Sequence, residues 1–444
     1  MLVKAKKRDI INSVKPPKKA PRLQDHLQEI DILKALELAA PEASNPKRYF
    51  CWDELQYRPS PEGLNSLTWW LGVKLHRQLG RMQLPLCDAE GKHFTFSLMP
   101  QILSLLHDID NYFGVLPHSA NGKRNYSTYR NAVSDEAIMS SVLEGAVVTR
   151  AEAQEMLRQN RPALNEHERM VRNNYRTMKY LLSRKEEDLT PDTVLELHRQ
   201  MTEDTMDDPA KSGCLRSAAD NVRVEHAITG ELIHMPPPAH QLPERLQLMC
   251  DFANGAGGYV HPVLRAVILH FWLAYDHPFV DGNGRTARAL FYWAMVRGGY
   301  DMVEYISISQ EIDSHPKRYY LSFQKTEHDD GDLNYFIFDQ LHTIVEAVQT
   351  LHWKEFEPDN ELYAGEDAAE NGVELNLRQK DFLQRMKQLP RGASYSVTAY
   401  CDDYKVVRQT ARTDLGALVE AKLLTCRKQG KQFLYSLASG ILYK

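Results

Sequence analysis

Residues 277–288 bring a base, a carboxylate, two glycines, an amide and two arginines together in one short stretch. Its sequence is His-Pro-Phe-Val-Asp-Gly-Asn-Gly-Arg-Thr-Ala-Arg. The ordinary pKa of histidine is about 6.5, so His277 can take a proton from an attacking hydroxyl at neutral pH. Asp281 can hold Mg²⁺ against phosphate oxygens. The stretch therefore offers both a general base and a metal ligand.

The other residues of the stretch favour an anion site. Gly282 and Gly284 leave backbone N–H groups unobstructed where a helix must start, and helix N-termini bind anions. Arg285 and Arg288 are three residues apart, so both project from the first helical turn and suit a polyphosphate. Asn283 can donate to a phosphate oxygen. Each part is ordinary alone, but their conjunction indicates phosphoryl or nucleotidyl transfer.

Two apolar runs, 263–275 and 289–296, flank the stretch. This pattern predicts a buried helix, a polar loop and a second buried helix. A loop held between two buried helices is positioned rigidly, as a catalytic site requires.

The stretch resembles the signature of the Fic family, His-Pro-Phe-x-(Asp/Glu)-Gly-Asn-Gly-Arg-x-x-Arg, with no departure at any fixed position. The resemblance implies a mainly α fold: a helical Fic core with a β-hairpin flap, which transfers AMP from ATP with Mg²⁺. It implies that His277 is the general base, Phe279 a buried anchor of the loop and Asp281 the Mg²⁺ ligand.

The same resemblance divides the phosphates of ATP among the remaining signature residues. Asn283 and the amides of Gly282 and Gly284 would hold the region of the α-phosphate. Arg285 and Arg288 would hold the outer phosphates.

An expected helix over 134–148, with Ser134 as its N-cap, contains Ser140-Ser-Val-Leu-Glu144-Gly145. Taken alone, Glu144 is a surface carboxylate at a helix end. The pattern resembles the inhibitory helix that precedes many Fic cores, and Ser140 belongs to the same motif. The resemblance implies that Glu144 pairs with Arg288, so that ATP binds unproductively and the protein rests inactive.

Residues 213–238 change to the two-residue period of strands, and Gly230 supplies the freedom of a turn, which predicts a β-hairpin. A plain surface hairpin fits the residues equally well. In Fic proteins this hairpin is the flap, which implies that it pairs with the target protein by strand addition. The expected flap residues are Ile228, Thr229, Gly230, Glu231, Leu232, Ile233 and His234.

Tyr319 and Tyr320 could line an adenine pocket, since aromatic faces suit a base. Neighbours on a helix cannot both face one site, so at most one makes close contact. Core packing explains either tyrosine equally well. His198, on a helix that Thr190 caps and Pro191 starts, is expected to be a packed core histidine rather than a ligand.

Charge is distributed unevenly along the 444 residues. Residues 1–22 carry eight Lys/Arg against one Asp, and residues 374–444 carry thirteen Lys/Arg against six Asp/Glu, so each end is +7. Because the whole chain is −5, the middle is −19. Any contact with nucleic acid is therefore expected at the ends.

The six cysteines show no Cys-x-x-Cys spacing, which favours reduced thiols in a cytoplasmic protein. No apolar run approaches the roughly 20 residues of a membrane span, and no secretory h-region is apparent. We therefore expect no membrane contact.

Five segments are expected: a basic disordered tail (1–22), an N-terminal helical extension (23–130), the Fic domain (131–353), an acidic linker (354–373) and a winged-helix domain (374–444). The extension mixes aromatic residues with helical periodicity, and its first helix is expected to end at Pro41.

The last segment reads as three helices and a hairpin with a basic turn at Arg427, Lys428 and Lys431. Its third helix starts with Arg408-Gln-Thr-Ala-Arg-Thr413, residues suited to phosphates and base edges in a major groove. Winged helices also mediate protein contacts, so the sequence leaves both partners open.

The sequence favours a nucleotidyltransferase that moves AMP from ATP to a Ser, Thr or Tyr hydroxyl of a protein, inhibited by Glu144. One alternative is the removal of AMP, in which Glu144 would orient a water. Another is a DNA-binding regulator whose Fic domain senses nucleotide or modifies only itself. The candidate partners are a target protein, the chain itself, a second copy as a homodimer, and DNA through 374–444.

Overall fold

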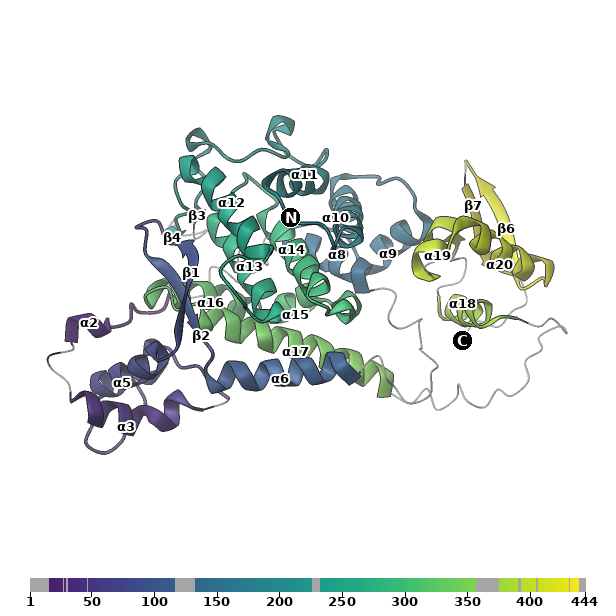
Figure 1. Ribbon diagram of the computed structural model, residues 1–444. Helices are drawn as coiled ribbons and strands as arrows, with labels where there is room; N and C mark the ends of the chain where they lie inside the picture. Colours follow the sequence, from purple (N-terminus) through teal and green to yellow (C-terminus); the bar gives the residue numbers. More distant parts are fainter. Residues whose placement is uncertain are drawn as a thin grey trace.

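The computed structural model describes residues 16–115, 132–225, 232–356 and 375–438, apart from positions 27, 29–30, 46, 390–392, 405 and 431. The fold is mainly helical, as predicted, with small antiparallel sheets (Figure 1). Several expected segments lie outside the described residues: most of the tail, the loop 116–130, the hairpin tip Ile228 to Glu231, most of the acidic linker, and Lys431.

The central helices of the fold surround the signature stretch. They are α8 (Ala132–Leu143), α9 (Arg150–Gln159), α10 (Glu166–Ser183), α11 (Pro191–Met201), α12 (Leu242–Ala253), α13 (Pro262–Asp276), α14 (Asn283–Arg297), α15 (Ile308–Ser314), α16 (Pro316–His328) and α17 (Asn334–Phe356). Short 3₁₀ turns connect some of them: η2 (Pro209–Lys211), η3 (Ala218–Asp220), η4 (Ala239–Gln241) and η5 (Asp301–Tyr305).

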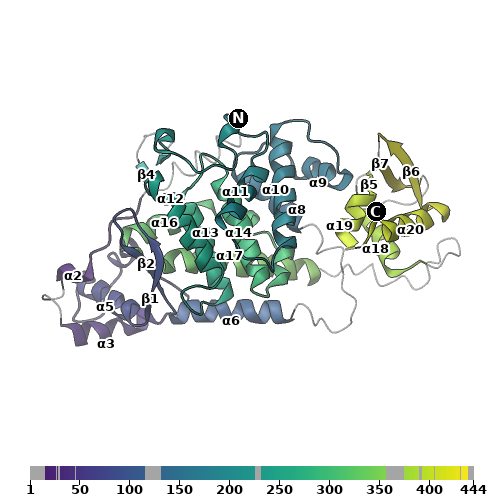
Figure 2. The same ribbon diagram turned by 45° about the horizontal axis from the view of Figure 1, so that its top comes forward.

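Helices α13 and α14 form the centre of the hydrophobic core (Figure 2). Their large side chains, such as Phe271, Trp272, Phe291 and Trp293, are at most 1% exposed. A helix that is apolar on every side is stable only when it is enclosed. The predicted arrangement of buried helix, polar loop and buried helix is confirmed, and the enclosing helices leave the loop little freedom to move.

In the residues that the structure describes, the N-terminal part contains five helices, in keeping with the predicted helical extension, and a hairpin that we did not predict. Its elements are α2 (Leu23–His26), α3 (Ile32–Ala43), α4 (Trp52–Leu55), α5 (Ser66–Gln78), β1 (Arg81–Cys87), β2 (His93–Ser97) and α6 (Pro100–Val115). The expectation that Pro41 ends the first helix is wrong, since Pro41 lies inside the last turn of α3. Lys74 of α5 binds Asp329 at 2.8 Å, which ties this part to the central helices.

The predicted hairpin of the flap is confirmed at its base. Strands β3 (Val224–Glu225) and β4 (Leu232–His234) pair antiparallel, with Val224 opposite His234. The hairpin leads through Pro236 to Pro238 into α12, and its base lies beside the end of α13.

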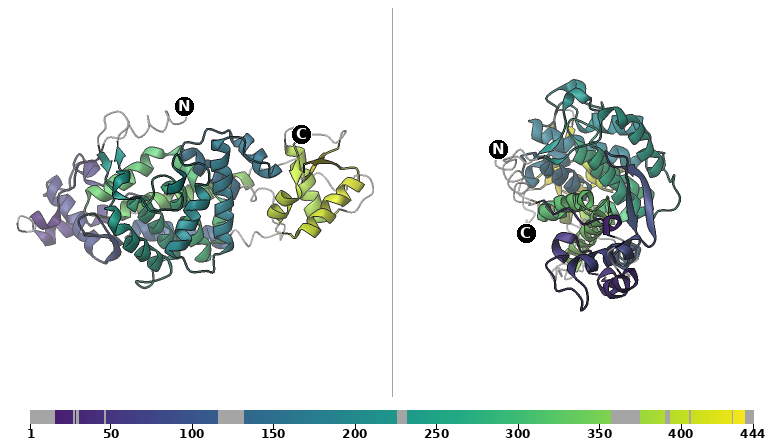
Figure 3. Two further views of the ribbon diagram at one scale, coloured as in Figure 1. Left: turned by 90° about the horizontal axis from the view of Figure 1, so that it is seen from above. Right: turned by 90° about the vertical axis from the view of Figure 1, so that its left-hand side faces the viewer.

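The C-terminal part has its own hydrophobic cluster. Its elements are α18 (Leu377–Gln388), β5 (Tyr395–Ser396), α19 (Val397–Tyr404), α20 (Arg408–Glu420), β6 (Leu424–Gln429) and β7 (Gln432–Leu437), with strand order β5-β7-β6. It contacts α9, where Arg158 Nε donates to the Ser394 carbonyl at 3.2 Å. The N-terminal helices and this part lie at opposite ends of the central helices (Figure 3). Among the described helices, none is long and apolar enough to cross a membrane.

Candidate active site

His277 caps the C-terminus of α13 with left-handed backbone angles, φ 46° and ψ 56°. Its Nδ1 lies 3.2 Å from the Ala274 carbonyl oxygen. Because a carbonyl only accepts, Nδ1 carries the proton and Nε2 keeps a free lone pair. Burial lowers the pKa of His277 to about 4, assisted by the charges of His234 and Arg216 and opposed by Ala274 and Glu144. At neutral pH the imidazole is therefore neutral, as a general base must be.

Arg216 fixes the turn that carries this histidine. Its Nε donates to the His277 carbonyl at 2.8 Å, and a terminal nitrogen donates to the Pro237 carbonyl at 2.6 Å. Its backbone N–H donates to the Pro278 carbonyl at 2.8 Å. Arg216 thus holds His277 together with Pro237, which lies just after the β3–β4 hairpin, a role that we did not predict.

Phe279 anchors the loop, as the family resemblance implied. Its side chain is fully buried and its ring stacks on His198, with centroids 3.7 Å apart and planes 4° apart. His198 Nε2 donates to the Asp281 carbonyl at 2.7 Å, while its Nδ1 accepts from the Gly213 N–H at 3.0 Å. His198 is the predicted core histidine, and it also positions the backbone of the loop.

The side chain of Asn283 closes the loop on itself. Its Oδ1 accepts from the Phe279 N–H and its Nδ2 donates to the Phe279 carbonyl, both at 2.9 Å. The resemblance implied a phosphate contact for Asn283. Both halves of its amide are already engaged, and the residue is 3% exposed, so in this structure the side chain shapes the loop instead.

Gly282 must be a glycine for reasons of backbone geometry. Its φ is 81°, and a Cβ built there would lie 2.9 Å from Thr202 Cγ2. We expect Gly282→Ala to lower the free energy of unfolding by about 1–3 kcal/mol, measured by denaturant titration. Gly416→Ala is the control, since it lies within α20 with no atom within 4 Å, and it should leave stability unchanged or raised. Equal effects of the two substitutions would contradict the assigned strain.

Asp281 and Arg285 form an ion pair at the edge of the loop. Asp281 Oδ2 lies 2.9 Å from a terminal nitrogen of Arg285, and the side chain of Asp281 is 54% exposed whereas that of Arg285 is 0% exposed. The resemblance implied that Arg285 holds an outer phosphate. Its enclosed guanidinium instead reaches Asp281 and the Met201 carbonyl, so in this structure it orients the exposed carboxylate. One accessible carboxylate beside a phosphate site suits Mg²⁺, which takes one or two carboxylates plus substrate oxygens.

Glu144 lies in the turn directly after α8 and contacts Arg288, as the resemblance implied. A terminal nitrogen of Arg288 lies 3.0 Å from Glu144 Oε1 and 3.0 Å from the Ser140 carbonyl, and Nε donates to Ser140 Oγ at 2.8 Å. Burial lowers the pKa of Arg288, but Glu144 and neighbouring groups outweigh it and raise the pKa. The guanidinium is thus held in place as a cation.

Gly284 makes room for this ion pair. A Cβ built on Gly284 would lie 2.3 Å from Glu144 Oε1 and 2.9 Å from a terminal nitrogen of Arg288. The carboxylate of Glu144 therefore rests directly against the first turn of α14. The expected helix 134–148 is shorter than predicted: α8 spans Ala132–Leu143, and Gly145 continues the turn with φ 95°.

A buried carboxylate on α8, which we did not predict, anchors the helix. Glu136 is 0% exposed and accepts from Tyr292 Oη at 3.1 Å, Ser307 Oγ at 2.8 Å, the Ser309 N–H at 3.0 Å and Ser309 Oγ at 2.5 Å. The only signal in the sequence is a carboxylate next to the apolar pair Ala137-Ile138. These bonds connect α8 to α14 and to the start of α15.

Tyr319 and Tyr320 lie near the Glu144–Arg288 pair. Burial raises the pKa of both hydroxyls, and the charges of Arg288 and Glu144 act on both. The Tyr319 hydroxyl lies 3.0 Å from His270 Nε2, and its ring packs edge-on against Tyr320, with centroids 5.5 Å apart. Both side chains are half-buried, which fits the predicted pocket and equally the core packing.

Of the predicted flap residues, the structure describes the backbone of Leu232 and Ile233 and the whole of His234. His234 Nε2 lies 2.8 Å from the Tyr275 carbonyl, two residues before the base. The structure thus brings the end of the β3–β4 hairpin close to the signature loop.

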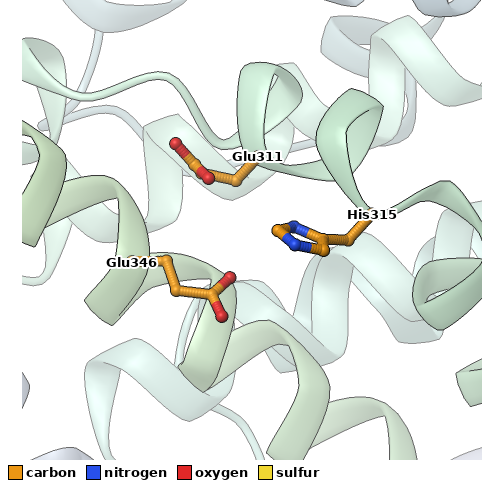
Figure 4. A group of neighbouring side chains, drawn as sticks. All are labelled: Glu311, His315 and Glu346. Atoms are coloured by element: carbon orange, nitrogen blue, oxygen red, sulfur yellow. The ribbon is translucent and has the colours of Figure 1, made fainter.

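A second group of possible metal ligands lies between α15 and α17. The ligating atoms of Glu311, His315 and Glu346 are all within 4.8 Å of one another (Figure 4). Both oxygens of Glu346 already bind Arg318, at 2.8 and 2.7 Å. We therefore assign this group a structural role.

Known proteins match the region that contains this site. Residues 188–295 match the family model described as Fic/DOC family. Protein adenylyltransferase fic-1 of Caenorhabditis briggsae is 26% identical over 212 residues, which cover 46% of this chain and 39% of the relative. Protein adenylyltransferase Fic of Nematostella vectensis is 32% identical over 157 residues, which cover 35% of this chain and 32% of the relative. The chain thus spans less than half the length of these relatives.

Among solved structures, a Fic family protein from Desulfovibrio desulfuricans G20 has a TM-score of 0.50 at 17% identity. The alignment covers 78% of this chain and 98% of that one, and it shows a shared fold. Glu144 and the C-terminal part lie outside the residues that match the family model.

Proposed function

Since residues 188–295 match the Fic/DOC family model, we propose that the protein transfers AMP from ATP to a hydroxyl group of a target protein. One observation carries the proposal: at the loop that begins helix α14, His277 presents a neutral imidazole whose Nε2 bonds to none of the residues that the structure describes. A base next to a helix N-terminus can deprotonate a nucleophile beside bound phosphate.

The reaction follows from the placement of these groups. The loop amides and Arg288 bind the triphosphate, and His277 Nε2 takes the proton of a Ser, Thr or Tyr hydroxyl. The oxygen bonds to the α-phosphorus, the bond to the bridging oxygen breaks, and pyrophosphate leaves. When bound to Asp281, Mg²⁺ would neutralise charge on the phosphates. Arg285 orients Asp281 through their ion pair.

Glu144 inhibits this transfer in the proposed scheme. Arg288 cannot bind an outer phosphate fully while it binds Glu144 and Ser140. A charge-assisted bond to a carboxylate contributes about 1.5–3 kcal/mol, so ATP must displace it to bind productively.

The hairpin of β3 and β4 is the proposed flap for the target protein. A target segment that adds as a strand gains backbone hydrogen bonds, which demand little of its sequence. The pairing places a hydroxyl of the target next to His277, because β4 ends beside the last turn of α13.

The test uses α-labelled ATP, wild-type protein, Glu144→Gly, His277→Ala and a cell lysate. Label on other proteins that requires His277 supports the transferase. Label that appears only on the chain itself supports a self-modifying regulator. Loss of AMP from a pre-labelled protein, blocked by Glu144→Gly, would instead support AMP removal with Glu144 orienting the water.

DNA binding by the C-terminal part is a second proposed function. Four polar side chains on the first two turns of α20 are exposed: Arg408, Gln409, Arg412 and Thr413, although Thr413 Oγ also bonds within the helix. Arg427 and Lys428 are exposed on β6. Three helices and a basic hairpin resemble a winged helix-turn-helix, whose third helix enters the major groove. Contacts with α9 and its C-cap Asn160 come from Ser394, from Ser396 of β5 and from Gln432 of β7, and Asp402 of α19 pairs with Lys179 of α10.

Substitution of these arginines tests the second function. We expect Arg408→Ala and Arg412→Ala each to weaken binding to duplex DNA and to lower the salt slope of log K by about 1, measured by fluorescence anisotropy. Lys422→Ala, just beyond the C-terminal end of α20, is the control and should leave the slope unchanged. Slopes that are the same for all three variants would show that α20 does not contact DNA.

A further inference from the structure

His234, the last residue of β4, bonds to two other elements at the base of the flap. Its Nε2 lies 2.8 Å from the Tyr275 carbonyl on α13. Its Nδ1 lies 3.1 Å from Glu327 Oε1 and 3.2 Å from Oε2 on α16. The imidazole also packs on the Tyr275 ring, with centroids 4.7 Å apart, and the side chain is 11% exposed. A single side chain therefore ties the flap to α13 and α16.

The partners of His234 decide its charge. A backbone carbonyl only accepts hydrogen bonds, and so does an ionised carboxylate. Both ring nitrogens of His234 must then donate, which makes the ring an imidazolium. Burial lowers the pKa of His234, but Glu327 and the Tyr275 carbonyl outweigh it and raise the pKa.

The catalytic loop lies directly beside this cation. Tyr275 precedes His277 by two residues, and Ala274, which fixes the His277 tautomer, lies on the same helical turn. Among the described residues, the charged and titratable groups beside His234 include Glu327 from α16 and Tyr275, Asp276 and His277 from the end of α13. Arg216 joins them by binding the carbonyls of His277 and Pro237.

We propose that His234 and Glu327 form an ionic latch that fastens the flap to α13 and α16 and whose positive charge adds to the effect of burial in keeping His277 unprotonated. The proposal deepens the transferase function above and rests on it. His234 is then a positioning residue, because it acts through the flap and the base rather than on the substrate. Without the latch, the flap would hold the target hydroxyl less firmly beside His277.

The sign of the pH dependence follows from the two histidines. A histidine whose folded pKa is raised stabilises the fold below its ordinary pKa and loses that contribution as the pH rises through the folded value. The charge of His234 therefore holds the latch at pH values below the ordinary histidine pKa of about 6.5, and the latch loosens as the pH rises through the raised folded value. His277 stays neutral down to its own pKa of about 4, so base and latch are both in their working forms between these limits.

The first test needs no catalytic activity. The titration of both imidazoles is followed by NMR in full-length protein labelled with ¹⁵N at histidine, with His277→Ala for assignment. We expect His234→Gln, which can still bond to Tyr275, to raise the His277 midpoint by up to about one pH unit. Glu327→Gln should lower the His234 midpoint. His240→Gln, an exposed histidine on η4, is the control and should change neither midpoint.

The second test measures the flap. Hydrogen exchange of the peptide spanning 224–236 should accelerate in both latch variants at pH 7, and in wild-type protein above the His234 midpoint. If AMP transfer occurs, KM for the target should rise several-fold while kcat at pH 7 changes less. The double variant with both His234→Gln and Glu327→Gln should show the same exchange rate and KM as either single variant, because each single substitution already removes the latch.

The outcomes separate the latch from the transferase function. Shifted midpoints and faster exchange without any AMP transfer would support the latch and count against the transferase. AMP transfer with an unchanged His277 midpoint and unchanged exchange, in variants that melt like wild type, would overturn the latch. If the His234→Gln protein does not fold, the NMR titration and the hydrogen exchange are measured in Glu327→Gln instead, with the lowered His234 midpoint and the faster exchange expected of that variant.

Discussion

Replacing Glu144 with glycine is expected to raise the rate of AMP transfer by about 10- to 100-fold. The estimate follows from the contact with Arg288 at 3.0 Å, since a charge-assisted hydrogen bond contributes about 1.5–3 kcal/mol and 1.4 kcal/mol corresponds to a factor of ten. Glycine removes the carboxylate and frees the guanidinium for an outer phosphate. The measurement is the initial rate of label incorporation from α-labelled ATP, on the chain itself and on lysate proteins.

Two further variants decide whether the charge of Glu144 is responsible. Glu144→Gln keeps the size of the side chain without its charge and should give an intermediate rate. Glu90→Gly removes an exposed carboxylate from the turn between β1 and β2 and should behave like wild type. The inhibitory role would be refuted by a Glu144→Gly protein that folds, binds ATP and transfers AMP at the wild-type rate.

Replacing His277 with alanine should reduce AMP transfer by about 10²- to 10⁴-fold, the usual contribution of a positioned general base. Nucleotide affinity should change little, because the loop amides and Arg288 remain. The rates are best compared in the Glu144→Gly background, where transfer is fastest, with ATP affinity measured separately by calorimetry.

The control for this loss is His107→Ala, which removes an exposed histidine from α6. It should transfer AMP at the rate of its parent. A His277→Ala protein that keeps most of its rate while binding ATP normally would show that another group accepts the proton, and the mechanism would have to be revised.

The helices of the core and the ends of the signature loop could be predicted from the sequence. Apolar runs on either side of 277–288 required buried helices, and α13 and α14 are these helices. Thr190 with Pro191 marked the start of α11, and Thr190 caps it. Such signals lie within a few residues of the helix ends that they specify. They can therefore be interpreted without knowledge of the tertiary structure.

Features that depend on distant partners could not be predicted. Arg285 and Arg288 are both arginines near the start of α14, yet their surroundings differ. Arg285 is enclosed and donates to the Met201 carbonyl, whereas Arg288 binds Glu144, which lies 144 residues earlier in the chain. Glu136 and His234 carry no local sign of their roles, because their partners lie on other helices. The hairpin of β1 and β2 was missed because its seven- and five-residue strands lie between strongly helical segments.

The way in which α8 is anchored in the core determines how quickly the ion pair between Glu144 and Arg288 can break. Glu136 fixes the helix through four hydrogen bonds in the core, whereas Glu144 sits just past the helix end with its side chain 21% exposed. Displacing the helix would break the buried bonds and require a collective motion of microseconds to milliseconds, whereas turning the half-buried side chain of Glu144 breaks only its own contacts. We therefore expect a rotation of Glu144 alone to equilibrate faster than a displacement of α8. Activity would then follow the instantaneous occupancy of Arg288, without lag or hysteresis, when the nucleotide concentration is changed abruptly.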